Sequence, residues 1–79
     1  MKITDLRTGH TYVGEHVDTI AGKSQPTDEQ LENYFGAVPG SPQYAGYKRA
    51  TTHKRYVLQY AAGKHYVVTV NAKFFMVTK

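Results

Sequence analysis

Three short runs rich in tyrosine, valine, phenylalanine and threonine fill the carboxyl-terminal third of the chain. Two turn-like segments separate them, AAGK at residues 61–64 and NAK at residues 71–73. Aromatic and β-branched residues favour strands, and short turns join neighbouring strands in antiparallel order. The segment from His53 to Lys79 therefore predicts a three-stranded antiparallel meander around which the rest of the chain is organised.

The turn at Gly63 predicts which side chains of the first two strands share a face. A left-handed glycine after a type I turn closes a three-residue loop with a bulge, because glycine has no Cβ to clash. Lys64 then pairs with Tyr60, and successive residues alternate between the two faces. The apolar face of this hairpin consists of Tyr56, Leu58, Tyr66, Val68 and Val70, and its mixed, partly basic face consists of Arg55, Val57, Gln59, His65 and Thr69.

Two features of the meander stay open. A two-residue loop at Ala62 and Gly63 is the alternative to the bulge, and it would mix the two sets of side chains, so their clean separation favours the bulge. The second turn lacks an Asn-Gly pair, and the pattern does not decide which side of the final strand faces the core. The choice is between Phe74 with Met76 and Phe75 with Val77.

The amino-terminal segment, residues 1–21, has two interpretations. Its threonine, tyrosine and valine content favours a strand, a turn at residues 8–9 and a second strand at residues 11–13. The alternative is a helix, because apolar residues between positions 13 and 21 recur at helical spacing. Gly14 inside such a helix would cost about 1 kcal/mol. The strand is therefore the preferred interpretation.

A capping box marks the start of a helix directly after the GKSQP connector at residues 22–26. Thr27 is the N-cap, and the side chain of Gln30 reaches back to it. The helix is expected to span residues 28–35 and to end at Gly36, which suits a left-handed C-cap.

This short helix needs a surface to pack on, because two turns are not stable alone. Leu31, Tyr34 and Phe35 share one side of it. We expect this side to cover the apolar face of the meander. Residues 37–47 are dense in glycine, proline and serine and predict an irregular surface loop.

Length and composition indicate a single small domain over residues 1–79, of the α+β class. At this size, burial only just offsets the entropy of ordering the chain. Cysteine is absent, so neither a disulfide nor a thiolate zinc site can stabilise the fold. The apolar runs are too short to span a bilayer, and the amino terminus lacks the pattern of a signal peptide. We therefore expect a cytoplasmic protein that does not associate with membranes.

Charge is distributed unevenly along the chain. All six acidic residues lie in the first 32 positions beside three bases, a formal charge of −3, whereas the remainder carries seven bases and no carboxylate side chain, a formal charge of +7. This polarity favours an anionic partner. The alternative is that the acidic part packs against the basic part and neutralises it.

Motifs for catalysis are absent. The four histidines match no zinc spacing, the glycines form no phosphate-binding loop, and neither serine lies in a nucleophile elbow. A domain of this size also rarely encloses a small-molecule pocket. We therefore expect no metal, no cofactor and no small-molecule substrate, and we interpret the chain as a non-catalytic binding protein.

The binding hypothesis rests on a group of basic and aromatic residues. Lysine and arginine contact phosphates or carboxylates, and tyrosine and arginine planes stack on bases. We expect an open surface that docks on nucleic acid or on an acidic protein that handles it, as small phage or mobile-element inhibitors do. The final strand, a predicted sheet edge, could also join two copies. The candidate binding residues are Tyr44, Tyr47, Lys48, Arg49, Lys54, Arg55, Gln59 and His65.

One catalytic alternative rests on a resemblance. The segment KRYVLQYAAGKHYVVTV resembles the end of small ribonuclease toxins of the RelE-like kind, which carry arginine, lysine, histidine and tyrosine on an antiparallel meander. The quoted segment, residues 54–70, covers about a fifth of the chain, and the paired helices of that family are not predicted here. It implies RNA cleavage without metal, which replacement of His53 and His65 is expected to stop.

Overall fold

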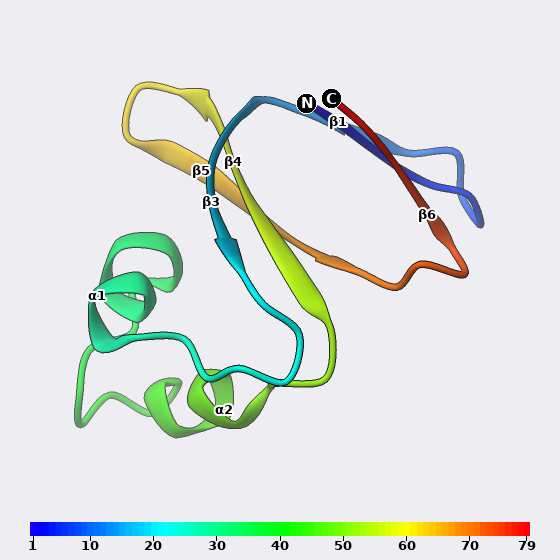
Figure 1. Ribbon diagram of the computed structural model, residues 1–79. Helices are drawn as coiled ribbons and strands as arrows, with labels where there is room; N and C mark the ends of the chain where they lie inside the picture. Colours follow the sequence, from blue (N-terminus) through cyan, green and yellow to red (C-terminus); the bar gives the residue numbers. More distant parts are fainter.

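Six strands form two antiparallel sheets of three strands each in the computed structural model, which describes residues 1–79 (Figure 1). The terminal sheet, in the order β2-β1-β6, contains β1 (Lys2–Asp5), β2 (Thr11–Val13) and β6 (Phe75–Thr78). The central sheet, in the order β3-β4-β5, contains β3 (Glu15–Ile20), β4 (Lys54–Ala61) and β5 (Lys64–Val70). The predicted α+β class and the antiparallel pairing are confirmed.

The hairpin of β4 and β5 has the predicted faces. Tyr56 pairs with Val68 and Leu58 pairs with Tyr66, as expected. The loop itself differs, because Lys64 pairs with Ala61 across a two-residue turn in which Gly63 has a φ of 68°. A register shift between Gln59 and Ala61 compensates for the shorter loop and restores the predicted pairing along the rest of the hairpin.

The third predicted strand leaves the hairpin and joins the other sheet. β6 pairs with β1, with Val77 opposite Ile3, instead of continuing beside β5. Phe75 and Val77 pack against the core, which settles the choice that the sequence left open, and Phe74 is exposed. β6 lies at the edge of its sheet. Joining of two copies through this edge stays a prediction.

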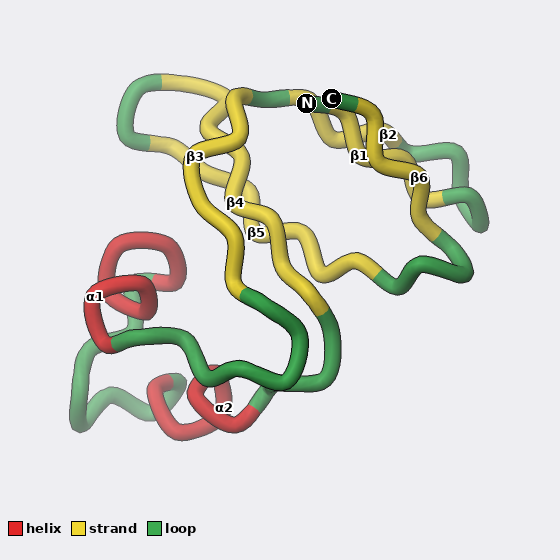
Figure 2. Tube along the Cα trace, viewed as in Figure 1, coloured by secondary structure: helices red, strands yellow, loops and turns green.

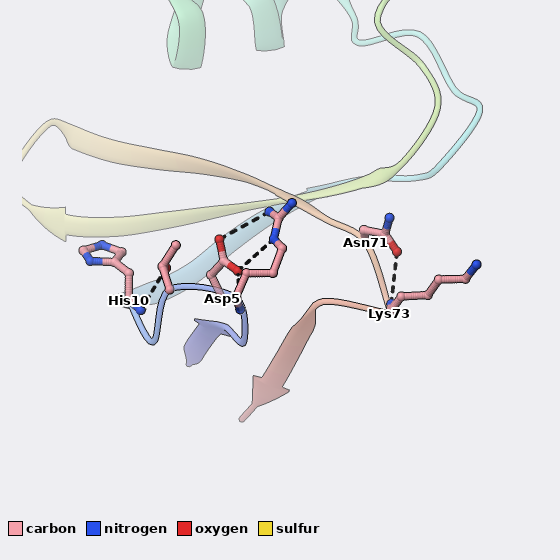
Figure 3. A network of polar contacts seen from close by, with 6 residues as sticks. Asp5, His10, Asn71 and Lys73 are labelled. Atoms are coloured by element: carbon pink, nitrogen blue, oxygen red, sulfur yellow. Dashed lines mark hydrogen bonds and ion pairs between the residues drawn. The ribbon is translucent and has the colours of Figure 1, made fainter.

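Two turns at the far end of the terminal sheet are closed by side chains (Figure 3). After β1, the carboxylate of Asp5 accepts hydrogen bonds from Nε and Nη2 of Arg7, at 3.2 and 3.3 Å. Between β5 and β6, the side-chain oxygen of Asn71 accepts from the backbone N–H of Lys73 at 3.0 Å. This second turn lets the chain cross from one sheet to the other.

The strand interpretation of the amino-terminal segment is confirmed. β2 continues into β3 through Gly14, which is where the chain passes from the terminal to the central sheet. A Cβ at this position would lie 2.8 Å from the backbone oxygen of Gln59. Glycine is therefore required by close approach of two backbones at the point where the sheets separate.

The central sheet is covered on both faces (Figures 1 and 2). On one face, Leu58 and Val68 form the apolar core with Ile3 of the terminal sheet. On the other, the ring of Tyr34 in the helical segment lies 5.3 Å from the ring of His65, centroid to centroid. The expectation that the helix covers the apolar face is wrong, because the terminal sheet already occupies that face.

The predicted helix is present with its predicted ends. α1 (Asp28–Gln30) runs directly into the π-helical η1 (Leu31–Phe35). Both hydrogen bonds of the capping box form, and the helix ends at Gly36 with a φ of 65°. Leu31 is fully buried and anchors the segment.

A second helix, α2 (Tyr44–Arg49), occupies part of the stretch predicted as an irregular loop. Gly46 lowers its intrinsic helix propensity. Tertiary contacts compensate, because Tyr44 and Lys48, one helical turn apart, both donate to the carboxylate of Asp28 at the start of α1. None of the helices combines the length and the hydrophobicity that crossing a membrane requires.

Candidate functional site: a basic pocket beside the chain ends

The predicted binding residues do not share one open face. The structure divides them among helix α2, the buried side of the central sheet and the wall of a pocket. Tyr44, Tyr47, Lys48 and Arg49 lie on α2, Arg55, Gln59 and His65 lie on the side of the central sheet under the helices, and Lys54 lies in the pocket.

Arg55 is structural. Its side chain is only 4% exposed, and its Nη2 donates to the backbone oxygen of Ser24 at 2.8 Å. Nε of the same guanidinium is buried without a hydrogen-bond partner, and burial lowers the pKa of Arg55. The expectation of an open face at Arg55 is wrong, because the connector before α1 and the helices themselves lie over this side of the sheet.

Gln59 and His65 are half-buried neighbours on β4 and β5. His65 packs edge-on against Tyr34, so it belongs to the contact between sheet and helix. His53 precedes β4, six residues before the position paired with His65. At a rise of about 3.3 Å per residue, the two histidines are roughly 20 Å apart. The structure therefore does not bring His53 and His65 together at one phosphate.

Helix α2 uses most of its polar groups internally. The hydrogen bond from Nζ of Lys48, at 2.8 Å, and the one from the hydroxyl of Tyr44 hold the pKa of Asp28 below its ordinary value of 3.8. The same contact with Asp28 raises the pKa of Lys48. Tyr47 packs on Phe35 with ring centroids 4.7 Å apart. These contacts attach α2 to the first helical segment, and a role of Tyr44, Tyr47 and Lys48 in binding stays a prediction.

Few direct ion pairs join the acidic part of the chain to the basic part, although β3 pairs with β4. The structure contains two ion pairs, Arg7 with Asp5 and Lys48 with Asp28, and only the second joins the two parts. Asp18 takes its hydrogen bonds from the neutral groups of Gln30 and Tyr34 instead of from a base. The carboxyl-terminal part therefore keeps an excess of uncompensated positive charge.

Part of this charge, on Lys54 and Lys79, lines a pocket of about 430 Å³. The two chain ends, which contribute Met1 and Lys79 to its lining, lie side by side (Figure 1). We call this pocket the basic pocket. Its walls come from β3, from β4 and from the residues flanking β1 and β6. The lining residues are Met1, His16, Thr19, Lys54, Tyr56 and Lys79.

The basic pocket has the side chains of an anion site. Nζ of Lys54 lies 5.5 Å from the ring centroid of Tyr56, and the imidazole of His16 lies 5.4 Å from the same ring. Nε2 of His16 is within hydrogen-bond distance of the hydroxyl of Thr19. None of the lining side chains is a carboxylate. The pocket therefore combines ammonium, imidazole and hydroxyl groups, which together can donate several hydrogen bonds to one anion.

Sequence reasoning identified only Lys54 in this pocket. His16, Thr19 and Lys79 come from segments that lie far away in sequence. The missing signal is the long-range pairing of β3 with β4, which sets Thr19 opposite Tyr56. Local periodicity does not contain this register.

No group of three histidine, aspartate or glutamate side chains is placed to hold a metal ion. Comparison with protein-family models, with curated proteins and with solved structures finds no match to this chain.

Proposed function

We propose that this protein binds nucleic acid without catalysis and that the basic pocket is its phosphate site. One observation carries the proposal: the only pocket in the structure is lined by Lys54, Lys79 and His16 and by no carboxylate side chain. Lysine supplies a charge with three donors, and charge-assisted hydrogen bonds to phosphate are about twice as strong as neutral ones.

Exposed bases outside the pocket support a polymeric ligand. Lys64 and Lys73 are exposed and form no ion pair. Lys64 begins β5 and Lys73 lies beyond its end, so the length of the strand separates them and one small anion cannot contact both. A chain of phosphates can follow such separated charges, and release of its counterions adds to the binding free energy. An acidic protein surface is the competing ligand, and the experiment below separates the two.

The test is binding of labelled single-stranded and duplex RNA and DNA, measured by fluorescence anisotropy across a range of salt concentrations. Lys54→Glu combined with Lys79→Glu is expected to weaken binding about tenfold or more. For a single strand, the slope of log affinity against log salt is expected to fall by about 1.4, since each lost phosphate contact removes about 0.7.

The matched control is Lys2→Glu combined with Lys23→Glu, which changes the net charge equally at exposed positions outside the pocket. An equal loss of affinity in both double variants would assign binding to net charge alone and contradict a phosphate site. If the unmodified protein binds no nucleic acid, an acidic protein becomes the expected ligand of the same charges. Cleavage of the RNA during the assay would favour the ribonuclease alternative.

A further inference from the structure

A row of four aromatic rings lies at the opposite side of the core from the basic pocket. Tyr60 and Tyr66 are stacked, with ring centroids 4.2 Å apart and an interplanar angle of 25°. Tyr66 meets the edge of Tyr12 at 5.6 Å, and Tyr12 meets the ring of His10 at 4.5 Å. We call these four residues the tyrosine cluster. It joins the loop before β2 to the end of the β4–β5 hairpin.

The tyrosine cluster ends on an open ring. Tyr60 is 48% exposed and Tyr66 is 36% exposed. Tyr60 lies at the register shift of the hairpin, where no partner is assigned to it across the ladder. One face of the Tyr60 ring stacks on Tyr66, and Tyr60 stacks on no other ring of the chain, so the stack can be extended there.

The charge beside Tyr60 and Tyr66 is positive, whereas His10, at the other end of the tyrosine cluster, lies near Asp5, which is paired with Arg7. Lys64 is two residues from Tyr66 on the same strand and therefore on the same face. The whole hairpin, residues 54–70, contains no acidic residue. The exposed edges of tyrosine also carry hydroxyl groups, which a dry apolar contact would leave unsatisfied. Stacked aromatic rings next to a lysine match the chemistry of a nucleobase joined to a phosphate.

The two sites flank one buried residue of the central sheet, Leu58. Leu58 pairs with His16 of the pocket on one side and with Tyr66 of the cluster on the other. Two strand spacings of about 4.8 Å therefore separate the backbones of His16 and Tyr66, about 10 Å in total. The buried side chain of Leu58 lies between the two sites, so they are distinct surfaces on either side of the core.

We infer that the tyrosine cluster is a stacking platform for unpaired bases, and that the ligand is therefore a single-stranded nucleic acid. Bases of a duplex are already stacked and paired, and only unpaired bases offer a free π face to a protein side chain. The inference rests on the proposed function, because the same strand places a phosphate in the basic pocket.

The test compares two single strands of equal length and charge, one with bases and one abasic. Tyr60→Leu keeps an apolar side chain but removes the ring, and it is expected to weaken binding of the normal strand about tenfold. Its affinity for the abasic strand is expected to match that of the unmodified protein. Tyr60→Phe keeps the ring and is expected to bind the normal strand as the unmodified protein does.

The outcomes separate this inference from the proposed function. Equal affinities of the unmodified protein and Tyr60→Leu for the normal strand would overturn stacking, even if the pocket variants fail to bind. Unchanged binding of the abasic strand by Lys54→Glu with Lys79→Glu would overturn the phosphate site instead. Self-association of the unmodified protein that Tyr60→Leu abolishes, measured by sedimentation, would assign the tyrosine cluster to a contact between two copies and overturn the inference.

Discussion

The two faces of the central sheet are both buried, but by different chemistry. One face packs Leu58 and Val68 against the terminal sheet, and its core is apolar. The other packs against the helices through Val57 and through polar groups, because Arg55 donates to Ser24 and Asp18 accepts from the helical segment. A face with an arginine and an aspartate is thus an interior surface here.

This difference shows where binding groups can lie. When both faces of a sheet are covered, exposed side chains come from the rims where the layers separate. The basic pocket lies at one rim, and the tyrosine cluster lies at another. A mixed hydrophobic and basic strand pattern therefore does not by itself indicate a binding face.

The largest expected effect tests the polar interior. Arg55→Glu places a carboxylate where the structure has no compensating base, and it is expected to destabilise the fold by about 3 to 5 kcal/mol. Arg49→Glu, an exposed position at the end of α2, is the matched control and is expected to leave stability unchanged. Urea unfolding followed by circular dichroism measures both. Equal stability of the two variants would mean that Arg55 is exposed and does not belong to the interior.

The apolar interior gives an effect of similar or smaller size. Leu58 is fully buried in contact with both sheets, so Leu58→Ala removes packing and leaves a cavity. The expected loss in the free energy of unfolding is about 2 to 5 kcal/mol. The same urea experiment measures it. A loss below about 1 kcal/mol would mean that the terminal sheet does not pack on this face.

The smallest effect concerns Asp18 and appears as a pH dependence. Burial would raise the pKa of Asp18, but hydrogen bonds from Gln30, Tyr34 and the amide of Thr19 outweigh it and lower the pKa below 3.8. Its stabilising contribution is therefore complete above pH 3.8 and is lost as pH falls through the lowered value.

Asp18→Asn is expected to destabilise the fold by about 1 kcal/mol at neutral pH. It should also lose less stability on acidification than the unmodified protein does. Some acid sensitivity remains, because the pKa values of Asp5 and Asp28 are lowered as well. Thermal unfolding between pH 2 and pH 7 measures the difference. Parallel curves for the two proteins would contradict the contact between Asp18 and the helix.

Local signals predicted much of the fold. The capping box at Thr27, the glycine after the helix and the alternation along the hairpin depend on residues that are close in sequence, and each is present in the structure. Helix α2 was missed because its stabilising contact is with Asp28, which is 16 residues before Tyr44. The residue types around Tyr44 do not indicate a contact with a residue so distant in sequence.

The candidate site was predicted less well for the same reason. Which hairpin face lies open depends on what the other segments cover, and the pairing of β6 with β1 decides that at long range. Lys54 was predicted as a binding residue and lines the basic pocket, whereas Arg55, the next residue, points to the opposite face and is buried. Alternation along a strand separates these two neighbours, and only the tertiary structure shows which one is exposed.

The proposed ligand is expected to bind at the rims and not on helix α2 or the mixed face. The most direct test is to titrate the isotope-labelled protein with a short single-stranded oligonucleotide and to follow its backbone amide signals by NMR. We expect the largest shifts at His16, Thr19, Tyr56 and Tyr60, with little change between Tyr44 and Arg49. Shifts concentrated on α2 and at His65, with an unperturbed pocket, would place the ligand on the helical side of the molecule instead.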